Sequence, residues 1–544
     1  MNILIVIPAR GGSKGIPRKN LRLLDGKPLI YYAIKTALSL HYNLDVYVSS
    51  EDEEILNTAI QFGAKVHQRD SSIADDKTTL DPVIYACYEY ARRMENKKYD
   101  FVITMQATSP LLKASSLDNA IEKILANKSI ETMIASKDNT HLSWRKENNR
   151  FLPNYKKRVN RQYLTPTFTE TGAFFITRED IITQDNRIGK NVELYLLSNG
   201  EEIDIDTYED WHLCEYHLKR KHILFVVTGN SDVGLGHVYN TLLIANDILN
   251  HQVTFLVDTQ SQMAYDKIAS NNYPVTIQKE QNILDDIKKI NPDIIINDRL
   301  DTQEDYMLSL KKEDYTVINF EDLGSGACHA DLVINAIYPE KGILTNHYFG
   351  YDYFLLRDEF MHASQKKIMP KVKNVLITFG GVDLNNYAKD VIEAIYDYCQ
   401  KYKIKITVVA GFGYNQYESL QKYVDIDIKK NIVNISKYML AADVIFTSAG
   451  RTTYEIASLG VPAIVLAQNE RELTHFFASN EFGFLNLGLG YNVSKKTLYR
   501  NFIDIVESEE SRHSMSILMK KTNLKSGRNT VNRLIQNLIE AGRV

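Results

Sequence analysis

The first residues of the chain that could do chemistry form a glycine-rich, cationic stretch at its start, IPARGGSKGIPRKN. Glycines let a backbone approach a ligand closely, and main-chain N–H groups beside cations bind polyanions. The spacing fits neither a Walker loop nor GxGxxG, so we predict a different kind of nucleoside triphosphate site. The alternative is a turn with solvated cations. We predict Arg10, Lys14 and Lys19 as catalytic cations that neutralise the triphosphate. The predicted substrate-binding residues of this stretch are Gly11, Gly12, Ser13 and Asn20, with Asn20 a candidate for contacts to the base or ribose.

A pair of carboxylates, Asp204 and Asp206, lies in the segment IDIDTYED. We expect residues 203–205 to form a strand, whose period of two places both carboxylates on one side. Two such carboxylates are good ligands for Mg²⁺, which prefers oxygen ligands and triphosphates. The alternative is that Asp206 caps the helix that begins near Tyr208, together with Asp210. We predict both Asp204 and Asp206 as metal ligands, with Asp206 also catalytic.

Polar side chains between these two places follow further expected strands. Arg69 comes after the expected strand 64–68, and Gln106 and Ser109 come after the strand 101–105. Gln106 could hydrogen-bond a base edge, and we predict all three as substrate-binding residues. A turn before a helix would explain Gln106 and Ser109 equally well when they are taken alone.

The elements that position these residues alternate between strands and helices. Residues 3–7 are a β-branched apolar run typical of a buried parallel strand, and residues 28–40 have helical apolar spacing. A strand at 45–48 follows, with Ser50 as the expected N-cap of the next helix. Such alternation predicts an α/β fold with a mostly parallel, Rossmann-like sheet. Ligands of these sheets bind beyond the carboxyl ends of the strands, where the glycine-rich stretch lies.

The same pattern of strand, glycine-rich loop and helix begins again at residue 222 and a third time at residue 375. We therefore expect three domains, at residues 1–220, 221–365 and 366–544. The last two resemble paired Rossmann-like lobes with a cleft between them. In the second lobe Gly450 and Thr452 open a helix whose N-terminus suits a diphosphate. Glu455, in its first turns, could reach ribose hydroxyls, although a helix dipole alone also favours an acid there.

The start of the chain resembles the acylneuraminate cytidylyltransferases, which make CMP-sialic acids. The resemblance rests on IPARGGSKGIPRKN, RDSSIADD, QATSP and IDIDTYED. It implies Mg²⁺-dependent transfer of CMP from CTP to a nonulosonic acid, with release of pyrophosphate. It also implies that Arg161 and Gln162 lie near the sugar. Thr169 and Thr171 replace an Arg and an Asn that are usual in sialic acid enzymes, so the sequence does not indicate which nonulosonic acid is used.

The rest of the chain resembles the GT-B fold and, within it, the UDP-sugar hydrolases of pseudaminic acid synthesis. The motifs are GLGHVYN, FLLRDEF, TFGGVD and SAGRTTYE. The resemblance implies that His237, preceded by Gly236, activates water at the anomeric carbon of a UDP-sugar. Two departures are Asn240, where an Arg is usual, and QNERELTH, where an Asn-Gln pair is usual. The alternatives are a glycosyltransferase and a non-catalytic nucleotide-sugar-binding or oligomerisation module.

Composition narrows the classes of protein further. The 544 residues carry a net charge of −4, which gives no electrostatic reason to expect nucleic acid or a membrane as a partner. The four cysteines form no CxxC pair, and neither a signal peptide nor a membrane-spanning run is evident. We expect a cytoplasmic enzyme with small-molecule substrates: CTP, a nonulosonic acid and a UDP-sugar. We also expect a homo-oligomer, whose size the sequence does not give.

Overall fold

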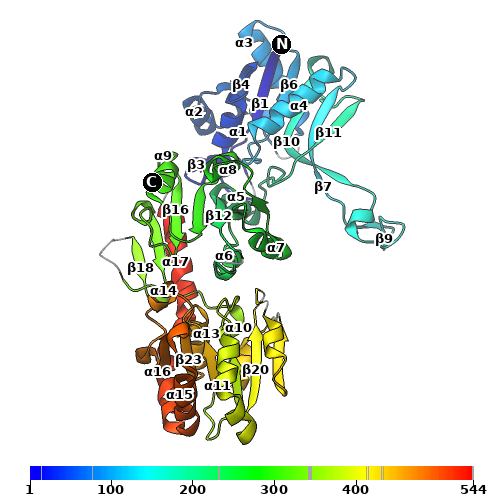
Figure 1. Ribbon diagram of the computed structural model, residues 1–544. Coiled ribbons are helices and arrows are strands. Elements are labelled where there is room, and N and C mark those ends of the chain that lie inside the picture. Colours follow the sequence, from blue (N-terminus) through cyan, green and yellow to red (C-terminus); the bar gives the residue numbers. More distant parts are fainter. Residues whose placement is uncertain are drawn as a thin grey trace. The chain divides into compact units, whose positions relative to one another are not determined.

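The chain forms two compact units, Met1–Arg220 and Lys221–Val544 (Figure 1). The computed structural model describes residues 1–541 with the exception of 14, 76–77, 231–232, 341–345, 412, 415, 431 and 433. Lys14, one of the predicted phosphate-binding cations, therefore lies outside the described residues.

The first unit is built on a seven-stranded, mostly parallel sheet. Its strand order is β11 (Val192–Leu196), β7 (Thr132–Asp138), β10 (Phe168–Arg178), β6 (Phe101–Met105), β1 (Asn2–Pro8), β4 (Asn43–Ser50) and β5 (Lys65–Gln68). Only β10 runs antiparallel to its neighbours. The strand order reverses at β1, which pairs with β4 on one side and β6 on the other. Such a switch point is where α/β sheets bind ligands.

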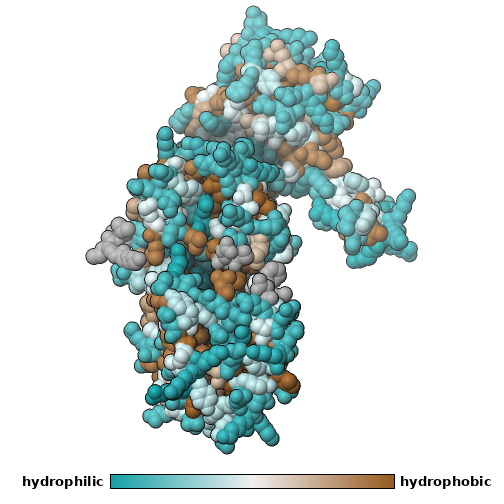
Figure 2. Space-filling view, viewed as in Figure 1, coloured by the Kyte–Doolittle hydropathy of each residue, from teal (hydrophilic) through white to brown (hydrophobic). Residues whose placement is uncertain are grey.

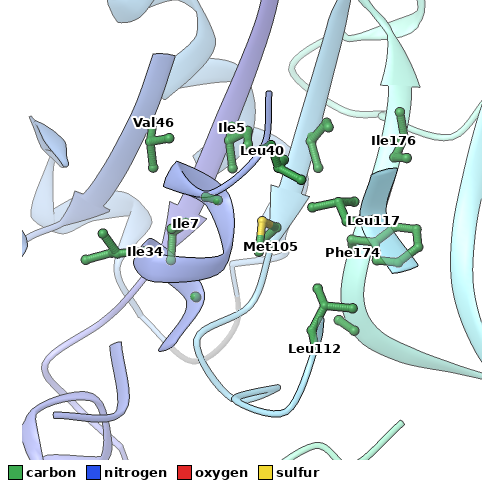
Figure 3. Packing of buried hydrophobic residues seen from close by; sticks show 14 of the residues in the cluster. Ile5, Ile7, Ile34, Leu40, Val46, Met105, Leu112, Leu117, Phe174 and Ile176 are labelled. Atoms are coloured by element: carbon green, nitrogen blue, oxygen red, sulfur yellow. The ribbon is translucent and has the colours of Figure 1, made fainter. Parts of the chain in front are cut away.

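Helices cover both faces of this sheet, because β1 is apolar on both sides. Ile5 and Ile7 of β1 pack with Ile34 of α1 (Leu29–Leu38) and Leu117 of α4 (Ala114–Ala126), as Figure 3 shows. On the other face Leu4 and Val6 pack against α3 (Leu80–Glu95). All of these apolar side chains are fully or almost fully buried. The result is a three-layer core that holds the strand ends in place.

Two further local features complete the first unit. The helix α2 (Glu53–Gln61) is capped by Asp52, whose Oδ1 accepts from the N–H groups of Glu54 and Ile55, so the prediction of Ser50 as its N-cap is wrong. Ser50 belongs to β4 instead. A hairpin of β8 (Trp144–Glu147) and β9 (Arg150–Pro153) stands away from the main sheet in Figure 1.

The second unit contains two Rossmann-like sheets, in which every strand pair is parallel. The first sheet has the order β14 (Val275–Ile277), β13 (Gln252–Val257), β12 (His222–Val227), β15 (Ile294–Asp298), β16 (Thr316–Phe320), β17 (Leu332–Asn335) and β18 (His347–Phe349). The second has the order β21 (Ile426–Lys430), β20 (Lys405–Ala410), β19 (Asn374–Ile377), β22 (Val444–Thr447), β23 (Ala463–Ala467) and β24 (Phe484–Leu489). Their switch points are β12 and β19, each the first strand of its sheet in the sequence. The predicted α/β fold class, with a GT-B-like pair of lobes after the first domain, is confirmed.

The last helix corrects the predicted extent of the second lobe, 366–544. Helix α17 (Gly527–Ala541) buries Val531, Ile535 and Ile539 in the same apolar cluster as Ile223 and other residues of the first lobe. Its Arg528 donates from Nη2 to Asp247 Oδ1 of the first lobe at 2.6 Å. The chain therefore returns to the first lobe after building the second.

The visible surface in Figure 2 is largely hydrophilic, with scattered hydrophobic residues. Scattered apolar side chains are normal on soluble domains. Among the described residues, no helix is both long enough and apolar enough to span a bilayer.

Candidate active sites

In the first unit, an apolar contact joins the glycine-rich loop to the segment that carries the carboxylate pair. Ile16 of the loop and Ile205 are both fully buried, in one cluster with Trp211 of α5 (Tyr208–Lys219). Gly15 permits this approach, because a Cβ at that position would lie 2.6 Å from the carbonyl oxygen of Asp206. Burial of the two isoleucines thus fixes two segments that lie far apart in the sequence next to one another.

Lys19 links the two segments directly. Its Nζ donates to the carbonyl oxygen of Ile205 at 2.5 Å and lies 3.2 Å from Asp206 Oδ1. On the other side of the loop, the buried Asn20 donates to the carbonyl oxygen of Arg10 at 3.0 Å. The predicted residues Arg10, Lys19, Asn20 and Asp206 therefore belong to one locality, with Gly11, Gly12 and Ser13 in the loop between Arg10 and Lys19.

The segment that carries the carboxylates is not the strand predicted at 203–205. It is irregular, and Ile205 N–H donates to the carbonyl oxygen of Thr108 at 2.8 Å, outside any sheet. The alternative role for Asp206 as a helix cap is also wrong. Thr207 caps α5 and forms a reciprocal capping box with Asp210. Asp206 is left exposed beside Lys19.

Asp204 is the more enclosed of the two carboxylates. Its Oδ1 is buried and has no hydrogen-bond partner among the described residues. Burial raises the pKa of Asp204, a hydrogen bond from Thr108 opposes that rise, and the nearby charge of Asp206 adds to it. An unsatisfied buried carboxylate oxygen beside a second carboxylate fits an oxygen-liganded cation. In the part of the chain that the structure describes, no group of three or more His, Cys, Asp or Glu could hold a metal.

Glu51, which sequence reasoning missed, holds the start of the glycine-rich loop. Its Oε1 accepts the N–H of Gly11 at 2.8 Å, and its carboxylate pairs with Arg69. The Arg69 side chain is only 4% exposed. Burial would raise the pKa of Glu51, but the hydrogen bonds from Arg69 and Gly11 prevail and lower it. Arg69, predicted to bind substrate, is thus paired within the protein. Arg69 follows β5 directly and Glu51 follows β4 directly, so the same rule that selected Arg69, a polar residue just after a strand, could have found Glu51.

The remaining predicted residues of the first unit divide into two groups. Gln106 and Ser109 follow β6 at the switch point, with Ser109 Oγ buried and without a partner among the described residues. Gly172 packs against Gln106, where a Cβ would lie 2.8 Å from its side chain. Arg161 and Gln162 are exposed, and Arg161 Nη2 lies 3.6 Å from Asp138 Oδ2. Among the described contacts, none joins Arg161 or Gln162 to the glycine-rich loop.

In the second unit, His237 lies at the start of α6 (Gly236–Asp247), beyond the switch-point strand β12. Its Nδ1 is 2.5 Å from Oδ1 of Asp298, the last residue of β15 and fully buried. The second oxygen of Asp298 accepts from Asn240 Nδ2 at 2.7 Å. An imidazole held at Nδ1 by a carboxylate presents Nε2 as a base. Asp298 was not predicted, although it ends an apolar strand next to β12.

Arg451 reaches this group from the second lobe. Its Nη2 donates to Asn240 Oδ1 at 2.6 Å, and its Nη1 lies 3.3 Å from Glu321 Oε1. Glu321 is 3% exposed, and burial raises its pKa to about 7 although Arg451 opposes the shift. Gly236 also adjoins this arginine, since a Cβ there would lie 3.7 Å from Arg451 Cδ. Side chains from both lobes therefore meet at Asn240, one helical turn from His237.

The predicted nucleotide-binding residues of the second lobe lie beside Arg451. Gly450 precedes it, and Thr452 begins α13 (Thr452–Leu459). Glu455, also on α13, is 8% exposed, and its Oε1 accepts from Arg357 Nε at 2.6 Å. Arg357 also lines a cleft of about 330 Å³, together with residues that include Tyr239 and Lys267. Neither His237 nor Gly450 lines that cleft.

Known proteins resemble the chain most clearly in its first unit. A family model described as Cytidylyltransferase matches residues 4–222. A pseudaminic acid cytidylyltransferase of Campylobacter jejuni is 34% identical over 231 residues, which cover 41% of this chain and 98% of that protein. An uncharacterized protein of Methanocaldococcus jannaschii is 31% identical over 270 residues, which cover 46% of this chain. The chain spans only 56% of the length of this second relative.

Among solved structures, that of MurG from Acinetobacter baumannii matches with a TM-score of 0.44 and 16% identity, over 58% of this chain and 99% of that one. Residues 4–222, which the family model matches, contain the glycine-rich loop, Gln106, Asp204 and Asp206. The relative from Campylobacter jejuni is matched over almost its whole length. The chain therefore belongs, through its first unit, to the cytidylyltransferase family.

Proposed function

We propose that the first unit transfers CMP from CTP to a nonulosonic acid and releases pyrophosphate. The observation that carries this proposal is the position of Lys19, whose Nζ contacts both the carbonyl oxygen of Ile205 and the carboxylate of Asp206. One cation therefore adjoins both the loop suited to a triphosphate and the carboxylates suited to its counter-ion. Family membership and the pseudaminic acid relative support the choice of reaction and of substrate class.

The reaction needs positioning and charge neutralisation more than a protein nucleophile. The anomeric hydroxyl of the sugar attacks the α-phosphorus of CTP, and the bond to the β-phosphate oxygen breaks as pyrophosphate leaves. Arg10 and Lys19 neutralise the triphosphate while main-chain N–H groups of the loop orient it. Gln106, which follows β6, would contact the cytosine or its ribose.

Asp204 and Asp206 would hold the Mg²⁺ ion of this site. The buried Oδ1 of Asp204 has no hydrogen-bond donor among the described residues, and a cation could occupy that vacant position. When bound, Mg²⁺ would supply charge neutralisation at the phosphates and favour ionisation of the sugar hydroxyl. Lys19, already beside Asp206, would share that carboxylate with the ion.

Incubation of the full chain with CTP, Mg²⁺ and a panel of nonulosonic acids tests this function, with pyrophosphate release as the measurement. We expect turnover with at least one acid and a loss of roughly 10²–10³-fold in Asp206→Asn. Glu209→Gln is the matched control, because Glu209 is an exposed acid in the same helix start. Near-normal turnover in Asp206→Asn would refute the metal assignment, and no turnover with any acid would refute the function.

For the second unit we propose hydrolysis of a UDP-linked amino sugar at its anomeric carbon. The observation that favours it is the contact between His237 Nδ1 and the buried carboxylate of Asp298. His237 Nε2 would take a proton from water as the oxygen attacks the anomeric carbon and the bond to UDP breaks. The diphosphate would lie at Gly450 and Thr452, where α13 begins.

Release of UDP from UDP-N-acetylamino sugars tests this second proposal. We expect His237→Asn to lose UDP release while CTP-dependent pyrophosphate release persists. UDP release only in the presence of an acceptor sugar would favour a glycosyltransferase instead. Binding of a UDP-sugar without any turnover would favour a non-catalytic binding module.

A further inference from the structure

A continuous path of hydrogen bonds runs from the second lobe of the second unit to His237. It begins at Arg451, passes through Asn240 and Asp298, and ends at the imidazole, with lengths of 2.6, 2.7 and 2.5 Å. Asn240 and Asp298 are 2% and 0% exposed. Because water has little access to them, each of these groups depends on its protein partners.

Each step of the path determines the direction of the next. A guanidinium only donates hydrogen bonds, so Arg451 requires the oxygen of the Asn240 amide to face it. The Nδ2 of Asn240 is then turned toward Asp298 Oδ2. With that oxygen occupied, Asp298 presents Oδ1 to His237 Nδ1 and selects the tautomer with hydrogen on Nδ1.

Arg451 is itself held in place by groups around it. Nη1 lies 3.3 Å from the buried Glu321 Oε1, and the guanidinium carbon lies 5.1 Å from the ring centre of Phe354. Glu321 adopts a φ of +51°, a conformation that L residues other than Asn and Asp rarely adopt. Such strain persists only where the surroundings enforce it. The backbone of Arg451 directly precedes α13, at the predicted diphosphate site.

We propose that Arg451 is a positioning residue for His237, and that it makes the orientation of this base depend on the second lobe. The proposal rests on the proposed hydrolysis by the second unit. The guanidinium touches neither the water nor the sugar; it fixes the Asn240 amide, and through it Asp298 and the imidazole. An open arrangement of the two lobes would therefore lack a correctly oriented base, and nucleotide-sugar held at the start of α13 would favour its assembly.

Replacement of Arg451 by Met tests the proposal, since Met keeps much of the volume but cannot donate. We expect kcat for UDP release to fall about 10- to 100-fold, as for other partners that orient a reactive ligand, with KM little changed. Arg471→Met is the matched control. Arg471 also joins the lobes, donating to Asp301 at 3.1 Å and to Tyr338 at 2.5 Å, but it lies off the path to His237.

A second readout is independent of turnover. In the full chain labelled with ¹⁵N-histidine, NMR should show His237 as a fixed Nδ1–H tautomer, with the signal assigned by its loss in His237→Asn. Arg451→Met should convert that signal to a mixture of tautomers, and Arg471→Met should not. Should Arg451→Met fail to fold, Asn240→Leu tests the same path, because a leucine side chain cannot donate to Asp298.

The outcomes separate this proposal from the proposed hydrolysis. If the wild-type protein turns over no UDP-sugar but the tautomer still changes in Arg451→Met, hydrolysis is refuted and the positioning role stands. If Arg451→Met leaves both the tautomer and kcat unchanged, the positioning role is refuted. A fall in kcat that Arg471→Met reproduces equally would also refute it, because the loss would then come from weakened contact between the lobes.

Discussion

The first unit places an exposed carboxylate beside a largely buried cation at its glycine-rich loop, whereas the second unit supports His237 with a buried carboxylate and a buried amide. Asp206 of the first unit is exposed beside Lys19, while Asp298 of the second unit is fully buried. Asp298 ends β15, the neighbour of the switch-point strand β12, and Asp206 follows Ile205, whose N–H donates to Thr108 in the segment after β6.

The difference in burial between Asp206 and Asp298 follows from the source of the negative charge at each site. In the proposed reactions, the triphosphate brings several negative charges to the first site, which therefore needs cations and a counter-ion. A neutral imidazole that takes a proton from water needs its own buried negative charge, held by fixed donors. On these proposals, similar folds support one site that is completed by its ligand and another that is completed by its own side chains.

The largest expected effect comes from exchanging the two sites' carboxylates for amides, one unit at a time. Asp206→Asn should lose roughly 10²–10³-fold in pyrophosphate release and keep UDP release. Asp298→Asn should lose UDP release by a similar factor and keep pyrophosphate release. Both activities are measured on each variant. Loss of both activities in either variant would show that the two sites are coupled and would invalidate the comparison.

A core substitution tests whether the units also differ as folding units. Phe174 is fully buried in the core of the first unit, so Phe174→Ala should cost about 3–5 kcal/mol of unfolding free energy. Calorimetry should show a lowered transition for the first unit and an unchanged one for the second. Phe151→Ala, at an exposed position of the β8–β9 hairpin, is the control, and a shift of both transitions would contradict independent units.

The buried Glu321 predicts a pH dependence that is specific to the second unit. Its pKa is raised from 4.5 to about 7 by burial, so the folded state holds a proton there that the unfolded state has lost. Relative to Glu321→Gln, the wild-type protein should therefore lose stability as the pH rises from 4.5 to about 7. Urea unfolding of both proteins at several pH values measures the difference. If the stability of the wild-type protein relative to Glu321→Gln instead rose with pH over this range, the assignment would be refuted.

Glu393 has a pKa shift of the opposite sign to that of Glu321, and the same unfolding experiment can measure it. Hydrogen bonds from Lys495 and Lys422 lower its pKa from 4.5 to about 2. Its stabilising contribution is therefore present above pH 4.5 and is lost as the pH falls toward 2. The difference between the wild-type protein and Glu393→Gln should consequently stay constant over the range in which Glu321 titrates.

The smallest expected effect concerns the helix start beside the carboxylates. Thr207→Ala removes one half of the capping box on α5 and should cost about 1 kcal/mol of stability. Pyrophosphate release should change little, because Thr207→Ala leaves two contacts of Asp206 in place: its carboxylate still lies beside Lys19, and its N–H still donates to Asp210 Oδ2. Denaturant unfolding and the CTP assay measure the two effects. A large loss of turnover would mean that the cap positions Asp206 after all.

The sequence predicted what is encoded locally. Apolar runs located β1 and β12, and glycines with cations located the loop that contains Lys19. It missed Glu51, Asp298 and Arg451, because their contacts join residues 40, 61 and 211 positions apart. It was wrong about the strand at 203–205, where alternating Ile and Asp suggested a ladder. Burial of Ile205 against Ile16 produces that alternation without a neighbouring strand.

The return of α17 to the first lobe has a consequence for biosynthesis. Val531, Ile535 and Ile539 complete a core whose first strand, β12, is made some three hundred residues earlier, so that lobe cannot close around its own centre during translation until the helix has left the ribosome. The first unit needs nothing from beyond Arg220 for its own compact core. A nascent chain halted before Gly527 would thus carry a finished first unit followed by a lobe with an uncovered apolar face, which chaperones recognise.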